Sequence, residues 1–367
     1  MIAGAGCWIL DAGYSMLDNA IQILPPFIEY RESNIEYLSA KILVASDQRS
    51  EIGGRVMRRT AFLFPGQGSQ SVGMGEEFYR EYDIVREIID MTEEISRINI
   101  SKLCFKGPME DLTMTVNLQP AVTAVNLACL AVIEKENVEF DYCAGHSLGE
   151  YSALSAAGVH SKEDTVRLVF KRGQLMHREA TRNHGAMHAI VGLPIDDVTD
   201  LVAEVQKDGI VSVANHNTEL QIVITGAPES VEKVSSLAIA RGAKSIPLKV
   251  SGAWHSELIK GAEEEFKAFL DTTPFNVPEK SIFFNVTADT SNDPDEIKDI
   301  MGRQLCSPVR WYDTLNKLMD EKVEIFVEVG PGRVLAGLLK KILPRDYPAK
   351  TYNVANMQQL EKFLKDV

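Results

Sequence analysis

Residues 142–151 have the sequence YCAGHSLGEY, which indicates a strand, a sharp turn and a helix. Tyr142–Gly145 has the pattern of a short buried strand, and the chain then turns at once through Ser147 into a helix. A G-x-S-x-G pattern between a strand and a helix is typical of a sharp turn that exposes a nucleophilic serine above the edge of a sheet. Glycine on each side of the serine removes Cβ atoms that would clash in such a turn. A serine that only caps a helix is the competing interpretation, and the strand–turn–helix context favours the nucleophile.

A serine nucleophile in this position needs an oxyanion stabiliser and a base. The N-terminus of the following helix offers free N–H groups and a positive dipole end for the oxyanion. Of the seven histidines, His255 is the candidate base, because a glycine-containing crossing, residues 251–256, can project it into a cleft. His146 adjoins the serine, but the alternation of a strand end points it away, so we expect it to pack. A Ser-Asp-His hydrolase carries its aspartate near the end of a late strand, and no aspartate stands out at such a position in this sequence. We therefore expect a backbone carbonyl or an amide to orient the histidine.

The segments on either side predict a large α/β domain. Residues 60–64 have the pattern of a buried strand that ends at Pro65-Gly66-Gln67-Gly68. Residues 119–136 are small or apolar on most faces, which predicts a buried helix. Three later elements complete the pattern, with strands at 281–286 and 325–329 and a helix at 334–342.

A second pattern interrupts this domain between residues 185 and 250. Its expected elements follow the order βαββαβ, which is that of a ferredoxin-like lobe. The chain then returns to the larger domain, so we predict a large domain that is split by an inserted smaller one. The expected elements are strands at 186–191, 211–214, 221–225 and 243–248 and helices at 195–206 and 228–241.

Composition limits the possible functions. The chain has 367 residues and a formal net charge of −14, and this acidity disfavours nucleic-acid binding, which needs clustered Lys and Arg. The sequence contains no run of about 18 apolar residues, so a membrane span is not predicted. The five cysteines, an odd number without a CxxC pair, argue against a metal site or a disulfide framework and favour a reducing cytoplasm.

The first 56 residues look unlike the rest of the chain. They combine an apolar start, residues 6–10, with Pro25-Pro26 and a polar tail through Gly53-Gly54. A basic segment before the apolar residues and a small-residue cleavage site are not evident, so a secretory signal is not expected. We interpret residues 1–56 as a weakly ordered extension, or as translation begun upstream of a natural start at Met57.

Three separated motifs, in the right order, carry a family resemblance. Residues 64–70, 145–151 and 328–332 have the sequences FPGQGSQ, GHSLGEY and EVGPG. Together they resemble the motifs of the malonyl-CoA:acyl carrier protein transacylases, and the similarity runs from about residue 58 to near the C-terminus. The resemblance implies an α/β fold with an α/β-hydrolase-like large subdomain and an inserted ferredoxin-like small subdomain. The implied boundaries are 57–184 and 251–367 for the large subdomain and 185–250 for the small one.

The resemblance also implies roles for individual residues. A nucleophile and a base form an acyl-enzyme, and a backbone carbonyl orients the base. Two backbone N–H groups form an oxyanion hole, and the planar guanidinium of an arginine binds the malonyl carboxylate. The implied nucleophile is Ser147, the implied base is His255, and Gln304 supplies the carbonyl that orients the base. Gln67 and Leu148 supply the two N–H groups of the oxyanion hole, and Arg172 binds the malonyl carboxylate.

A malonyl transfer between thiol carriers is the implied activity. Malonyl-CoA is the expected substrate and an acyl carrier protein the expected partner, in the fatty acid biosynthesis of a cytoplasmic monomer. No metal, cofactor, nucleic acid or membrane is expected. A trans-acting acyltransferase of a polyketide or polyunsaturated lipid synthase, or a malonyl-loading subunit of a decarboxylase, is the enzymatic alternative. A serine esterase and a catalytically inactive docking module are the alternatives from other classes.

Two residues depart from the family pattern. Trp254 stands directly before His255, where relatives usually have a serine or phenylalanine. Its bulky indole is expected to narrow the acyl pocket and to favour unbranched malonyl over methylmalonyl. His216 stands where relatives often have an aromatic residue.

Overall fold

The computed structural model describes residues 51–52, 55–56 and 58–367. The chain divides into two compact units, Met1–Met57 and Arg58–Val367. In the first unit, strands β1 (Glu51–Ile52) and β2 (Arg55–Val56) pair antiparallel. The expected weak order of the 1–56 extension otherwise lies outside the described residues.

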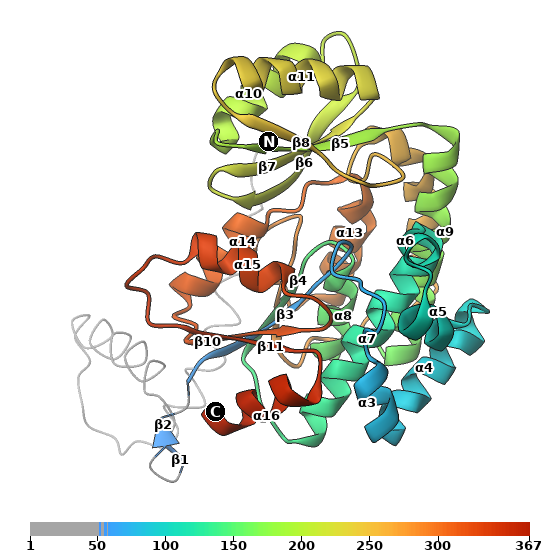
Figure 1. Ribbon diagram of the computed structural model, residues 1–367, viewed down its shortest axis with the longest axis vertical. Coiled ribbons are helices and arrows are strands. Elements are labelled where there is room, and N and C mark those ends of the chain that lie inside the picture. Colours follow the sequence, from blue (N-terminus) through green and yellow to red (C-terminus); the bar gives the residue numbers. More distant parts are fainter. Residues whose placement is uncertain (1–50, 53–54, 57) are drawn as a thin grey trace, which may run out of the picture. The chain divides into compact units, whose positions relative to one another are not determined.

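A five-stranded parallel sheet forms the centre of the second unit (Figure 1). Its strand order is β11-β10-β3-β4-β9, and each neighbouring pair is parallel. Parallel strands need crossover connections, which the intervening helices supply. The expected α/β fold class is confirmed. The strands are β3 (Thr60–Phe64), β4 (Tyr142–Gly145), β9 (Ser281–Phe283), β10 (Ile325–Val329) and β11 (Lys350–Val354).

Helices cover both faces of this sheet. Phe62 of β3 belongs to a core cluster with residues of α7 (Thr115–Lys135), whereas Leu63 packs with residues of α14 (Trp311–Asp320). A strand that is buried on both faces has no polar side, which explains the continuous apolar run of β3. The other helices around this sheet are α3 (Glu76–Glu81), α4 (Asp83–Ser96), α5 (Ile100–Lys106), α6 (Met109–Thr113), α8 (Gly149–Ala156), α9 (Lys162–Arg182), η1 (Glu257–Ala262), α12 (Glu263–Asp271), α13 (Pro294–Arg303), η2 (Gln304–Cys306), α15 (Val334–Ile342) and α16 (Met357–Asp366).

Helix α7 is the buried helix that the sequence predicts, although it begins at Thr115 rather than at residue 119. Within the described residues it is the one helix that is long and apolar enough to cross a membrane. However, its most apolar window is 89% buried inside the protein. It packs between α4 and α9 and is therefore a core helix.

A second, four-stranded antiparallel sheet has the strand order β6-β7-β5-β8. Its elements follow the chain order βαββαβ, and α10 and α11 contribute Val198 and Val231 to the cluster that packs against β5 and β7. These elements lie together at the top of Figure 1. They are β5 (Ala186–Val191), α10 (Ile195–Val205), β6 (Val211–Thr218), β7 (Gln221–Gly226), α11 (Pro228–Ala240) and β8 (Lys244–Pro247).

Backbone hydrogen bonds join the second sheet to the segment that follows η2. The Val309 N–H donates to the Ala214 carbonyl at 2.8 Å, and the His216 N–H donates to the Val309 carbonyl at 2.9 Å. Asn215 and Val309 thus form a parallel bridge. This bridge places β6 beside the residues that surround the candidate site described next.

Candidate active site

The turn after β4 holds Ser147 in a backbone conformation that L-residues rarely adopt. β4 ends at Gly145, α8 begins at Gly149, and Ser147 between them has a φ of 51°. A Cβ on Gly149 would lie 2.0 Å from the carbonyl oxygen of Phe64, so only glycine lets α8 approach β3 this closely. The sharp strand-to-helix turn that the sequence predicts is present, and strained backbone of this kind is common at functional sites.

Ser147 forms a hydrogen bond with a histidine. The distance between Ser147 Oγ and His255 Nε2 is 2.8 Å. His255 Nδ1 lies 3.1 Å from the carbonyl oxygen of Gln304 and 2.9 Å from that of Ser307. Because carbonyl oxygens only accept, Nδ1 carries the proton and Nε2 can accept from the serine hydroxyl. The family resemblance implied Gln304, whereas Ser307 was not predicted, because a backbone carbonyl leaves no signature in the residue type.

The environment of His255 keeps its ring neutral. Burial and the positive charge of Arg172 lower the pKa of His255 to about 3, against the opposing effect of the two carbonyl acceptors. A histidine with a depressed pKa remains unprotonated at every pH well above that value. His255 is therefore available as a proton acceptor throughout the neutral range.

Two backbone N–H groups beside Ser147 make no hydrogen bond within the part of the chain that the structure describes. They belong to Gln67 and Leu148, which line the same pocket as Ser147. The N–H of Ser147 itself is occupied, because it donates to Asn285 Oδ1 at 2.7 Å. A Cβ on Gly66 would lie 2.4 Å from the backbone of the nucleophile turn, so this glycine lets the Gln67 loop lie against it. Free backbone N–H donors beside a nucleophile can stabilise an oxyanion.

Arg172 is a buried cation that forms no ion pair with a carboxylate of the described residues. It lies on α9 and is 1% exposed. Its guanidinium donates to Ser147 Oγ at 3.2 Å, to Gln119 Oε1 at 3.0 Å and to Gln304 Oε1 at 3.3 Å. All three acceptors are neutral, and no carboxylate among the described residues forms an ion pair with this side chain. Buried charges are normally paired, so the arrangement favours an anionic ligand next to Ser147.

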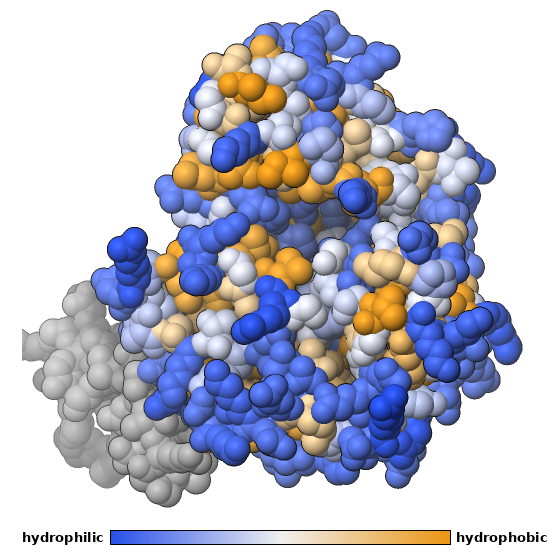
Figure 2. Space-filling view, viewed as in Figure 1, coloured by the Kyte–Doolittle hydropathy of each residue, from blue (hydrophilic) through white to orange (hydrophobic). Residues whose placement is uncertain are grey.

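These side chains line one pocket of about 110 Å³. Trp254 and Met176 form part of its wall, and Met187 on β5 and Asn215 on β6 contribute from the second sheet. Figure 2 shows that the surface is hollowed between the lobe of the second sheet and the rest of this unit. A larger cavity, of about 480 Å³, lies between residues 71–75 and 331–333, but neither a histidine nor a cysteine is among the described residues that line it.

His146 has the packing role that the sequence predicts. Its Nε2 lies 2.9 Å from Asn217 Oδ1, and its ring packs edge-on against the ring of Trp311, with 5.4 Å between the centroids. Burial lowers the pKa of His146, so the ring is neutral. The side chain joins the nucleophile turn to β6 and does not serve Ser147.

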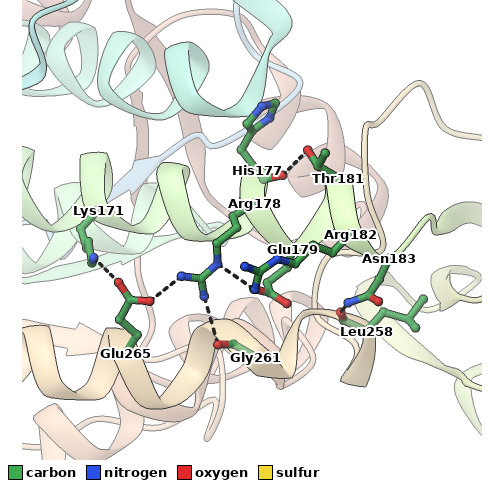
Figure 3. Close-up of polar contacts among 10 residues, drawn as sticks. All are labelled: Lys171, His177, Arg178, Glu179, Thr181, Arg182, Asn183, Leu258, Gly261 and Glu265. Carbon is green, nitrogen blue, oxygen red and sulfur yellow. Dashed lines mark hydrogen bonds and ion pairs between the residues drawn. The ribbon is translucent and has the colours of Figure 1, made fainter.

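A polar network fastens α9, the helix of Arg172, to the segment that follows His255 (Figure 3). Arg178 Nε donates to Glu179 Oε1 at 2.8 Å, and Arg178 also bonds the carbonyl oxygen of Gly261 and the carboxylate of Glu265. Lys171 pairs with the other oxygen of Glu265. The pairs of Glu265 with Lys171 and Arg178 are accessible to solvent, so each contributes little to stability. Glu179 is buried, and together these contacts hold α9 against η1 and α12.

The fold and this site together define an enzyme that transfers acyl groups. A model of the family described as the acyl transferase domain matches residues 61–364. The malonyl CoA-acyl carrier protein transacylase of Bacillus subtilis (strain 168) is 42% identical over 307 residues, which cover 83% of this chain and 96% of that protein. The chain belongs to the acyl transferase family, among the malonyl CoA-acyl carrier protein transacylases.

Solved structures lead to the same family. An acyl carrier protein S-malonyltransferase from Vibrio cholerae matches with a TM-score of 0.79 and 37% identity, over 83% of this chain and 99% of that one. A malonyl-transacylase solved in complex with its type II PKS acyl-carrier protein matches with a TM-score of 0.80 and 34% identity, over 84% of this chain and 100% of that one.

Proposed function

We propose that this protein transfers the malonyl group of malonyl-CoA to the phosphopantetheine thiol of an acyl carrier protein, through a malonyl ester on Ser147. The observation that carries the proposal is the buried guanidinium of Arg172, 3.2 Å from Ser147 Oγ and without a carboxylate partner in the described part of the chain. Malonyl is a short acyl group with a free carboxylate at its far end, which a guanidinium can bind in two-pronged fashion. The names of the relatives support this substrate and this partner.

In the first half-reaction, Ser147 Oγ attacks the thioester carbonyl while His255 Nε2 accepts the hydroxyl proton. The carbonyl oxygen becomes an oxyanion, which the N–H groups of Gln67 and Leu148 stabilise. The C–S bond then breaks, and His255 returns the proton to the departing CoA thiolate. The carbonyl of Gln304 orients the ring in both steps.

The second half-reaction repeats these steps with the thiol of the carrier. His255 accepts the thiol proton, the sulfur attacks the ester carbonyl, and Ser147 leaves with that proton. Because CoA departs before the carrier reacts, the kinetics are ping-pong. CoA is a substrate in this scheme, no cofactor takes part, and the reaction belongs to fatty acid biosynthesis in the cytoplasm.

The proposal is tested by supplying malonyl-CoA and a carrier protein with its phosphopantetheine thiol. Malonyl-carrier is the expected product, with one CoA released for each carrier loaded. A serine esterase would release malonate at the same rate with or without the carrier. That result would contradict the proposed transfer.

We propose that the carrier docks on a basic surface formed by Arg333, Lys340 and Lys341, with Lys249 near the second sheet. All four side chains are exposed, and the two lysines lie in the last turn of α15. Carriers of this family are typically acidic, so they would be repelled by a net charge of −14 unless a local basic patch met them.

Reversing both Lys340 and Lys341 to Glu is expected to slow transfer to the carrier by about tenfold or more and to weaken its salt dependence. Loading of Ser147 from malonyl-CoA should change much less, because the proposal assigns this surface to the carrier protein and not to CoA. Rapid-quench measurement of the two half-reactions separates the effects. An equal loss in both half-reactions would rule out this docking surface.

We also propose a division of the chain into three parts. Residues 57–184 and 251–367 form the large subdomain, residues 185–250 form the small subdomain, and residues 1–56 are a dispensable extension. The family match begins at residue 61, and the first strand of the parallel sheet begins at Thr60. A chain that starts at Met57 is therefore expected to keep its transfer rate within about twofold and its Tm within a few degrees. Loss of solubility, or of most of the activity, would assign the first 56 residues a structural role.

A further inference from the structure

Glu150 is a buried carboxylate beside the nucleophile that no step above uses. It lies in the first turn of α8 and is 0% exposed. Oε1 accepts from the backbone N–H of Asn285 at 2.7 Å, and Oε2 accepts from Gln304 Nε2 at 2.6 Å. Both oxygens meet donors, so the ionised form satisfies the geometry and a protonated oxygen would face a donor.

The two residues that Glu150 binds hold the backbone of Ser147 from both sides. Asn285 Oδ1 accepts from the Ser147 N–H at 2.7 Å, and Gln304 Nε2 also donates to the Ser147 carbonyl oxygen at 2.9 Å. Asn285 Nδ2 donates to the carbonyl of Gly145 at 2.7 Å, which ties the same amide to the end of β4. A non-glycine residue with a φ of 51° keeps that conformation only when its surroundings fix it.

The same network reaches the base. The carbonyl of Gln304 accepts from His255 Nδ1 at 3.1 Å, and its side-chain Oε1 accepts from Arg172 Nε at 3.3 Å. The Gln304 amide therefore has one required orientation, with its NH₂ group toward Glu150 and its oxygen toward Arg172. Glu150 selects this orientation, because a carboxylate accepts only from the NH₂ group.

We infer that Glu150 is a positioning residue whose carboxylate holds Asn285 and Gln304 in the orientations that align Ser147 with His255. This inference rests on the proposed acyl transfer, and it assigns Glu150 no contact with substrate. Loss of one of its two acceptor positions frees one of the groups that hold Ser147. A misplacement of about 1 Å at a reacting group can lower a rate by about 10²-fold.

Protonation of Glu150 has the same consequence as its replacement by Gln. Burial raises the pKa of Glu150 to about 7, against the opposing effects of Gln304, Asn285 and the charge of Arg172. Arg172 on α9 and Tyr151 on α8 are the charged and titratable groups that act on it, and His255 is already neutral in this range. As the pH falls through about 7, Glu150 gains a proton and one donor loses its acceptor. Acylation of Ser147 is therefore expected to slow on the acid side of neutrality.

The experiment compares Glu150→Gln with Glu328→Gln as a matched control. Glu328 on β10 is 1% exposed and also accepts two backbone N–H groups, from Leu335 at 3.0 Å and from Ala336 at 2.9 Å. The full-length proteins react with malonyl-CoA without a carrier, and rapid-quench mass spectrometry follows the malonyl ester on Ser147 across about pH 5–9. The Tm of each protein is measured alongside.

Glu150→Gln is expected to lower the acylation rate constant at pH 8 by about 10²-fold with little change in KM, and to remove the acid limb near pH 7 that the wild type shows. Glu328→Gln should keep the wild-type acylation rate constant and the acid limb near pH 7, even if its Tm is lower. Equal rates for Glu150→Gln and wild type, or an equal loss in the control, would overturn the positioning role. If Glu150→Gln does not fold, the pH–rate profile of the wild type decides. An acid limb near pH 7 supports the positioning role of Glu150, and a profile without that limb overturns it. A wild type that forms no malonyl ester would instead contradict the proposed function.

Discussion

Arg172→Ala is expected to lower malonyl transfer by about 10²–10⁴-fold while acetyl-CoA is used as well as before or better. Malonyl differs from acetyl by one carboxylate, and an apolar pocket would reject that charge because burying it unpaired is costly. The guanidinium of Arg172 is buried, and its hydrogen-bond acceptors among the described residues are neutral, so it reverses this preference. Removing one partner of a buried charge pair typically costs about 3–5 kcal/mol, which corresponds to this range of rates.

The ratio of malonyl to acetyl transfer rates is the measurement for Arg172. Acetyl leaves the guanidinium without its anion, so the wild type discriminates against it, and the alanine variant should lose that discrimination. Arg172→Lys should restore malonyl transfer only in part, since an ammonium cannot make the two-pronged contact. An unchanged ratio in Arg172→Ala would mean that another group binds the carboxylate, or that malonyl is not the substrate.

Ser147→Ala and His255→Ala are each expected to lower transfer by about 10⁴–10⁶-fold, and the double variant should be no slower than either. The two side chains share one hydrogen bond of 2.8 Å, and groups that act as a unit show losses that do not add. Without His255 the hydroxyl of Ser147 keeps its proton, and without Ser147 the base has no nucleophile to activate.

Steady-state transfer rates of the two single variants and the double variant, each with its Tm, give this comparison. The Tm values identify any loss that comes from unfolding. Additive losses in the double variant would show that Ser147 and His255 act independently. A His255→Ala variant that keeps more than about a tenth of the wild-type rate would move the base to another residue.

Several elements are predictable from the sequence to the residue. Strands β5 and β10 and helix α15 begin and end where the apolar pattern predicts. The differences arise where distant groups intervene. β9 ends at Phe283 rather than at residue 286, because the next N–H groups, of Phe284 and Asn285, donate to Asp289 and Glu150 instead of to a strand. β6 continues past residue 214 to Thr218. Its residue Asn215 bridges to Val309, and the local sequence pattern contains no sign of that partner.

The candidate site was predictable where its residues lie in motifs. The nucleophile turn and the Gln67 loop are short contiguous motifs, and the structure places them side by side. Asn285 and Ser307 were missed because each lies in a segment without a motif, and Ser307 acts only through its backbone carbonyl. Glu150 lies inside the GHSLGEY motif, but its partners come from more than 130 residues away, at |i−j| of 135 and 154, so its contacts could not be derived from spacing.

Trapping of the acyl-enzyme shows directly whether Ser147 carries the malonyl group. The full chain is incubated with malonyl-CoA in the absence of any acceptor thiol, quenched in acid and digested, and the peptide that contains Ser147 is analysed by mass spectrometry. The wild type is expected to carry one malonyl group as an ester on Ser147, which disappears when a carrier thiol is added before the quench. Ser147→Ala should carry none. A malonyl adduct on another residue, or malonyl-carrier formed by an enzyme whose Ser147 is never acylated, would contradict the proposed role of Ser147.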